Sequence, residues 1–342
     1  MLVRKIDISE ADAWDACVAA CPGASLYHRY AWRAFFADYF GKETEYLAAI
    51  DSAGSLEGVL PLVRLQSRLF GNFYVSLPFV NYGGVLTRGP DAAKALLAEA
   101  ADLARESGAT HVEYRHTDQQ VALPCRTDKV AMILELPESP EALGKAIGSK
   151  RRSQIKRPLR EHPDVCIGGA ELVDEFYAVF ARNMRDLGTP VYAKSLFRFL
   201  ADRFPDDVTL MVIRVNSRPA AAAFLLSDER GMEIPWASTV QDFNRISINM
   251  LLYWEVLKHA IESGKTLFDF GRSTVDSGTY RFKKQWGAEP VQLHWHYWLA
   301  TGEELPRINP DNSRYRLAIR MWQKLPLAVA NRLGPYLVRN LP

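Results

Sequence analysis

Residues 106–114 read ESGATHVEY, and residues 262–270 read ESGKTLFDF. The two segments share Glu, Ser, Gly and Thr at equivalent positions, and both end with an acid followed by an aromatic residue. Each has the pattern of a helix end, a glycine turn and a short buried strand. The sequence therefore predicts one helix–strand unit that is used twice; the alternative is a coincidence of turn chemistry.

The segments before these two copies follow the same order. In the first half, alternating apolar residues predict strands over 46–50, 58–65 and 73–77. A helix is expected over 90–106. In the second half, the corresponding strands and helix are expected over 210–215, 220–226, 232–237 and 247–262. This order predicts an α/β (α+β) fold in which mixed sheets are flanked by helices.

Length and composition predict two domains. The chain has 342 residues, 48% of them hydrophobic and 24% charged, which is typical of globular proteins. A single core seldom grows beyond about 250–300 residues, so we place a first domain at 1–140, a second domain with the active site at 141–300 and a tail at 301–342. The net charge of +2 argues against a general nucleic-acid binder.

The cysteines and the N-terminus indicate a reduced, cytoplasmic protein. The four cysteines and seven histidines follow no zinc-binding spacing, so no metal site is predicted. Cys17 and Cys21 lie one helical turn apart and read as small apolar residues of a helix face, with a redox pair as the alternative. The N-terminus has no apolar signal region, and no stretch reaches the roughly 18 apolar residues of a membrane span.

A dense polar segment follows the second copy of the repeat. Residues 271–290 read GRSTVDSGTYRFKKQWGAEP, in which aromatic residues alternate with cations before Gly287. This pattern favours an anionic or acyl-bearing ligand over a buried core. The candidate site residues from this segment and its strand are Asp269, Arg272, Tyr280, Phe282 and Lys283.

A basic stretch lies between the two halves. Residues 144–160 read GKAIGSKRRSQIKRPLR, which contains seven cations and no acid. On a helix, Arg152, Lys156 and Arg160 would form a ladder of like charges that repel one another. A phosphate-rich ligand would compensate this repulsion, so Arg152 and Lys156 are predicted to bind substrate; the alternative is a solvated helix that tolerates the charge.

Further substrate-binding candidates lie between the basic stretch and the second copy of the repeat. A helix over 171–187 ends at Gly188, which groups Arg185 and Tyr192 near its C-terminal end. Arg185 either binds substrate or complements the helix dipole. The other candidates are Trp236, Asn244 and Asn249.

The last 36 residues carry seven cations and one acid. A helical pattern places apolar residues together and cations at their edges, with Pro326 and Pro335 dividing the segment into short pieces. The apolar residues expected on one face are Leu317, Met321, Trp322, Leu325, Val329 and Leu333. Such a tail, over 314–339, either makes peripheral contact with an anionic membrane or packs on the protein's own core.

These motifs together resemble the FemAB family, and in particular its branch associated with PEP-CTERM/exosortase systems. The resemblance rests on SKRRSQIKRPLRE, RNMRDLGTP and, above all, FDFGRSTVDSGTYRFKKQWG, and it covers most of residues 1–300. It implies a pair of GNAT-like domains with catalysis in the second. It also implies transfer of an acyl or aminoacyl group to an amine on a cell-envelope or exopolysaccharide-linked acceptor.

The resemblance assigns the reacting residue and the donor. Family members carry a Phe-Lys pair in the last motif, which corresponds here to Phe282 and Lys283, and the lysine is thought to contact the acyl ester. The alternative for Lys283 is a structural salt bridge to Asp269 or Glu289. No tightly bound cofactor is implied; the donor is aminoacyl-tRNA, or alternatively acyl-CoA or an acyl carrier protein.

One segment departs from the acyl-CoA pattern. GNAT domains cradle the pyrophosphate of coenzyme A with a glycine-bearing loop at a helix N-terminus. The corresponding loop here, 239–247, reads TVQDFNRIS and contains no glycine. This makes coenzyme A a weaker candidate than tRNA. A non-catalytic GNAT-like binding module is the remaining alternative, and the oligomeric state is left open.

Overall fold

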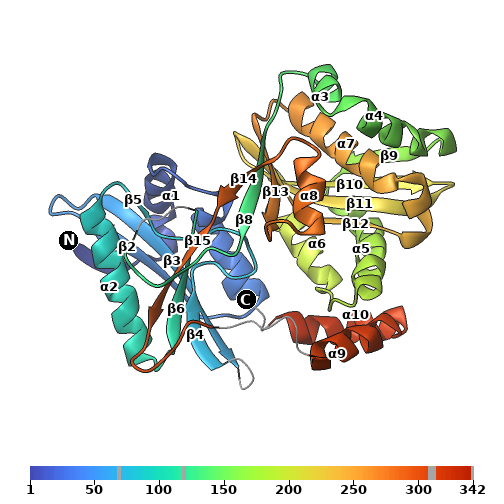
Figure 1. Cartoon of the computed structure of the whole chain (residues 1–342). Helices are drawn as coiled ribbons and strands as arrows, with labels where there is room; N and C mark the ends of the chain where they lie inside the picture. The colour runs from blue at the N-terminus through green and yellow to red at the C-terminus, as the bar shows by residue number, and fades with distance from the viewer. Residues whose placement is uncertain (68–70, 118–120, 307–312, 340–342) are drawn as a thin grey trace. The chain divides into compact units, whose positions relative to one another are not determined.

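The computed structural model describes residues 1–67, 71–117, 121–306 and 313–339, with the backbone alone for 313–316. The chain divides into two compact units (Figure 1). Of the described residues, the first unit contains those within 1–130 and 292–306 together with Arg339, and the second contains 131–291 and 313–338.

The first unit is built on a mixed sheet. Its strands run in the order β1 (Leu2–Lys5), β2 (Thr44–Ile50), β3 (Leu56–Ser67), β4 (Gly71–Val75), β6 (His111–His116), β15 (His294–Leu299) and β7 (Cys125–Arg126), with β5 (Leu86–Thr87) paired to β3. Helix α2 (Pro90–Glu106) packs its apolar side against this sheet, and α1 (Ala11–Ala20) packs against β3. Cys17 and Cys21 are buried and free, in agreement with a packing role.

The second unit has a sheet of its own. Its strands run in the order β14 (Glu289–Gln292), β8 (Val130–Glu135), β13 (Leu267–Ser273), β12 (Gly231–Thr239), β11 (Arg218–Ser227), β10 (Val208–Val215) and β9 (Asp164–Gly168). Figure 1 shows α7 (Ile248–Glu262) with α3 (Pro140–Ala146) and α4 (Gly148–Lys156) on one face, and α5 (Val173–Leu187) with α6 (Lys194–Arg203) on the other.

The strand pairing confirms the predicted repeat. The strand after each helix pairs in parallel with the third strand of its unit: Val75 lies opposite Glu113 in the first unit, and Glu233 lies opposite Asp269 in the second. The turns before these strands use Gly108 and Gly264, both with positive φ, which glycine adopts at no steric cost. The chain therefore holds two units of the same topology, each a mixed sheet flanked by helices.

Two details of the strand pattern differ from expectation. The predicted division at residue 140 gives β8 to the first domain and β15 to the second, whereas β8 lies in the second sheet and β15 in the first. Alternation of apolar residues identifies a strand but not the sheet edge that it joins, so the sequence could not reveal this exchange. The segment between α1 and β2 contains a 3-10 turn, Tyr30–Trp32, followed by a π turn, Phe35–Tyr39.

The C-terminal helices pack on the second unit. α9 (Ser313–Gln323) and α10 (Leu327–Val338) both contact α5. A Cβ atom at Gly334 would lie 2.7 Å from the backbone nitrogen of Val191, so α10 approaches that backbone closely. Pro326 separates the two helices as expected, but α10 continues through Pro335 to Val338. Arg307 and Asp311 of the predicted tail lie outside the described residues.

The buried side of the tail differs from the predicted apolar face, of whose six residues none is buried. Ala330, Gly334 and Val338 are buried, and Trp322 and Leu325 are half-buried. Leu317, Met321 and Leu333 are instead exposed, by 61%, 63% and 46%. The tail therefore packs on the protein's own core with one side and leaves apolar side chains on its surface with the other.

Candidate active site

The candidate site lies where β12 and β13 separate. For the described residues, the parallel register between the two strands ends at Glu233 and Asp269, while β12 remains paired with β11 as far as Thr239. The carboxyl-terminal parts of β12 and β13 therefore diverge. In open α/β sheets, ligands bind outside the carboxyl ends of such strands.

A glycine turns the end of β13 toward α8 (Gly278–Lys284). Gly271 has φ of 74°, a value that side chains with a Cβ disfavour, and its amide donates to Oδ1 of Asp269 at 2.6 Å. Ser277 caps α8 by accepting a hydrogen bond from the amide of Tyr280 at 3.2 Å. The positive φ of Gly271 and the cap at Ser277 together place α8 beside the end of β13.

Lys283 is the buried cation of this site. Its side chain extends from α8, and the residue is only 8% exposed. The Nζ atom donates to the carbonyl oxygens of Gly271 and Arg272 at 3.0 and 2.8 Å. An ammonium has three N–H donors, so in the described structure one of them remains for a ligand.

The electrostatic setting of Lys283 is mixed. Burial lowers its pKa to about 8, and the negative charges of Asp269 and Glu233 oppose this shift while Arg272 adds to it. The predicted salt bridge to Glu289 belongs to the neighbouring residue, since Lys284 pairs with Glu289 at 3.2 Å. One interacting group of charges thus surrounds the strand divergence. It consists of Glu233 from β12, Asp269 and Arg272 from β13, and Lys283 from α8.

Phe282 lies in an aromatic cluster beside Lys283. Its ring meets that of Tyr253 of α7 edge to face at 4.9 Å, and Tyr253 stacks on Phe270 at 5.8 Å. Phe282 therefore fixes α8 against α7 and sets the position of Lys283. Its predicted catalytic role remains a prediction, as does substrate binding by the half-buried Tyr280.

The predicted basic ladder lines a pocket at the N-terminus of α7. Arg152 and Lys156 are exposed on α4, whose Ile155 is buried, but the predicted ladder is interrupted because α4 ends at Lys156 and the exposed Arg160 lies in a 3-10 helix, Pro158–Glu161. The pocket measures about 670 Å³, and its lining contains no acid: Ser149, Arg152, Ser153, Gln154, Lys156, Arg157, Arg160 and Ser247. It is a place where side-chain cations and a helix N-terminus meet, which favours phosphate.

Ser247 begins α7 in an unusual conformation. Its φ of 63° is left-handed although it carries a side chain, and no side-chain hydrogen bond caps the first turn of α7. A 3-10 helix, Gln241–Ile246, leads into it in place of a glycine-bearing loop. The amide of Met250 donates to the Ser247 carbonyl at 2.9 Å, and no side-chain cap competes with a ligand for the amides of Ile248 and Asn249.

The remaining predicted site residues fall into separate environments. Arg185 donates to Asp186 at 2.7 Å and to the carbonyl of Leu325 at 3.1 Å, so it attaches the C-terminal segment to α5. Tyr192 and Trp236 do come together, with ring centres 6.2 Å apart. Asn244 accepts from the Thr239 hydroxyl at 3.2 Å, and Asn249 lies half-buried in the first turn of α7.

Two residues of the site escaped the sequence prediction. Glu233 was missed although an acid within the otherwise apolar strand MEIPWA was a usable signal. Ser247 was missed because a positive φ cannot be inferred for a serine.

The equivalent position of the first unit is filled by its own side chains. Glu113, which corresponds to Asp269, is 7% exposed and pairs with Arg115 at 2.7 Å. The Tyr297 hydroxyl donates to the same carboxylate at 2.8 Å from β15. Because these buried groups satisfy one another, this position stabilises the first unit, and the candidate site belongs to the second.

A comparison with protein-family models identifies the fold of the second unit. Residues 149–284, which include Lys283 and every residue given above as lining the basic pocket, match the family model of the acetyltransferase (GNAT) domain. No curated protein matches the sequence. The second unit therefore has the fold of a GNAT acetyltransferase domain, which supports an acyltransferase.

Several solved structures share the fold over most of the chain. FemX is 16% identical with a TM-score of 0.61, over 86% of this chain and 97% of that one. The C-terminal domain of a putative lysylphosphatidylglycerol synthetase from Agrobacterium fabrum is 14% identical with a TM-score of 0.56, over 91% and 95%. L-PGS from Bacillus licheniformis is 13% identical with a TM-score of 0.56, over 94% and 99%. At these identities the likeness is one of fold.

Proposed function

We propose that the protein is a Fem-like transferase that forms an amide bond on a cell-envelope or exopolysaccharide-linked acceptor. The observation that carries this proposal is the buried Lys283 ammonium, held by two carbonyl groups at the divergence of β12 and β13 within the GNAT domain. The PEP-CTERM/exosortase-associated branch is part of the same proposal, on the basis of the motif in residues 268–287.

The proposed chemistry needs no nucleophilic side chain. The acceptor amine attacks the carbonyl carbon of the donor ester or thioester, a C–N bond forms, and the C–O or C–S bond breaks. The amine loses a proton, and the alcohol or thiol leaves with one. The negative charge that develops on the carbonyl oxygen is stabilised by the remaining N–H of Lys283, which is already fixed in place and shielded from water.

The proposed donor is an aminoacyl-tRNA. The pocket of about 670 Å³ at α4 and Ser247 offers cations and uncapped helix amides to phosphates, and its lining matches an RNA backbone as well as a pyrophosphate. Acyl-CoA or an acyl carrier protein is the alternative donor. A non-catalytic binding module is the alternative function.

The experiment that tests this function is a product assay. The protein is incubated with aminoacyl-tRNA, acyl-CoA or acyl carrier protein and a panel of amines, and mass spectrometry measures the new amide. We expect one donor class to yield amide. Donor binding without amide from any donor would instead support the binding module.

We further propose that the outer side of α9 and α10 binds an anionic membrane, where a lipid-linked acceptor would be located. Tyr336 of α10 is 67% exposed and Met321 of α9 is 63% exposed, and the exposed cations Arg320 and Lys324 lie on α9 and directly after it. Apolar side chains edged by cations match the surface of an anionic bilayer. Among the described residues, no helix is both long and apolar enough to span a membrane.

A further inference from the structure

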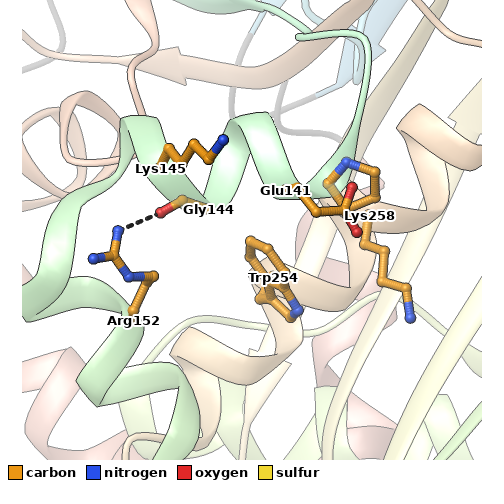
Figure 2. Close-up of a pocket in the computed structure, with 7 residues that line it drawn as sticks. Glu141, Gly144, Lys145, Arg152, Trp254 and Lys258 are labelled. Carbon is orange, nitrogen blue, oxygen red and sulfur yellow. Dashed lines mark hydrogen bonds between the residues drawn. The ribbon is translucent and has the colours of Figure 1, made fainter.

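A second pocket lies beside the basic one, on the outer face of α7. It is an open depression of about 440 Å³ that is bordered by α3, α4 and α7. Its lining consists of Pro140, Glu141, Gly144, Lys145, Arg152, Trp254 and Lys258. Figure 2 shows Trp254 in the middle of this group, with Arg152 on one side and Glu141 and Lys258 on the other.

An aromatic side chain at the centre of this pocket is exposed to a ligand. Trp254 is half-buried, and Gly144 lies next to its ring: a Cβ atom there would be 3.5 Å from Cη2 of Trp254. Any longer side chain at position 144 would therefore fill the space beside the ring. A planar group is the ligand that a half-buried indole and an adjacent glycine accommodate best.

The two pockets share Arg152, which lines both. Its guanidinium donates to the carbonyl of Gly144 at 2.7 Å, which holds it at the boundary between them. Trp254 follows Ser247 by seven residues on α7, a distance along the helix of about 10 Å. This separation is comparable to the reach of a nucleotide from its phosphates through the ribose to the base.

We propose that the two pockets form one nucleotide site, in which the phosphates lie among the α4 cations near Ser247 and the base stacks on Trp254. Arg152 contacts the nucleotide where the two parts meet, and Lys145 adds positive charge along the base pocket, while Lys258 is paired with Glu255 and Glu262. Glu141, the acid of this pocket, accepts hydrogen bonds from amino groups of the base. This inference rests on the proposed function, because it describes the carrier of the donor's acyl group.

The test compares ligands with and without a base. Calorimetry measures binding of ADP and of pyrophosphate to the full-length protein and to Trp254→Leu. We expect Trp254→Leu to weaken ADP by about tenfold or more, the lower part of the range for stacking one base on an aromatic side chain. Pyrophosphate binding should stay within about twofold of the wild type, because its site contains no part of Trp254.

Two further variants make the result specific. Trp254→Phe keeps an aromatic face and should retain most of the ADP affinity, while Lys156→Glu should weaken ADP and pyrophosphate alike. The thermal unfolding midpoint of each variant reports on folding. The proposal is overturned if Trp254→Leu binds ADP as the wild type does, or if it weakens pyrophosphate by the same factor as ADP.

Titration of two more ligands shows which molecule carries the nucleotide. Coenzyme A and a short RNA ending in CCA both carry an adenine nucleotide, and each is titrated into the same variants. The ligand whose affinity depends on Trp254 identifies the carrier. These measurements report binding and require no turnover. A failure of the base site would appear in them, whereas a failure of the transferase function would appear in the product assay.

Discussion

Replacing Lys283 by methionine should lower the rate of amide formation by about 10²–10³-fold, the typical cost of removing one oxyanion donor. The substitution keeps the length and apolar stem of the side chain and removes the charge. The Nζ atom that donates to Gly271 and Arg272 is lost, but a buried charge is lost with it. We therefore expect the thermal unfolding midpoint to stay within a few degrees of the wild type.

Lys284→Met is the matched control for this prediction. Lys284 is the next residue on α8, but it is exposed and pairs with Glu289 on the surface. Exposed pairs contribute about 0–1 kcal/mol, so this variant should keep its activity and its stability. Equal rates for wild type and Lys283→Met, or equal losses in the two methionine variants, would show that Lys283 has no role in the reaction.

Reversing two cations of the tail should release the protein from anionic vesicles. Each cation near such a surface contributes about 1 kcal/mol, so Arg320→Glu with Lys324→Glu should lower the partition coefficient by about 30-fold or more. Sedimentation with anionic and with neutral vesicles measures this. Truncation of the tail is a poor test, because α9 and α10 pack on α5 and their removal exposes that face.

A control of equal charge change keeps this result interpretable. Arg88→Glu with Lys94→Glu reverses two exposed cations of the first unit and leaves the tail intact. These substitutions should change the partition only slightly. If both pairs of reversals weaken vesicle binding equally, or if the wild type binds anionic and neutral vesicles alike, the tail is only a packing element.

The repeat could be predicted because its signals are local. Gly108 and Gly264 each end a helix, and the strands after them carry an acid at the same position. Alternation of apolar residues then located the other strands of both sheets. The exchange of β8 and β15 between the sheets could not be predicted, since it depends on which sheet edge accepts a strand.

The candidate site could be predicted only in part, for a similar reason. Lys283 and the α4 cations stand out as charges in an unusual local context, whereas the importance of Glu233 follows from its register with Asp269. The contact of Arg185 with the carbonyl of Leu325 could not be predicted, because the two residues are distant in sequence. The pocket at Trp254 likewise requires α3, α4 and α7 to be in place.

The pH dependence of kcat/KM tests the proposed role of Lys283 most directly. Burial lowers its pKa to about 8, so the ammonium is present at neutral pH and is lost as the pH rises through about 8. Lys283→Arg stays charged throughout and corrects for ionisation of the acceptor amine. We predict that the ratio of the wild-type rate to the Lys283→Arg rate falls above pH 8. A ratio that rises through pH 8, as for a lysine acting as a base, or that stays constant would contradict the account.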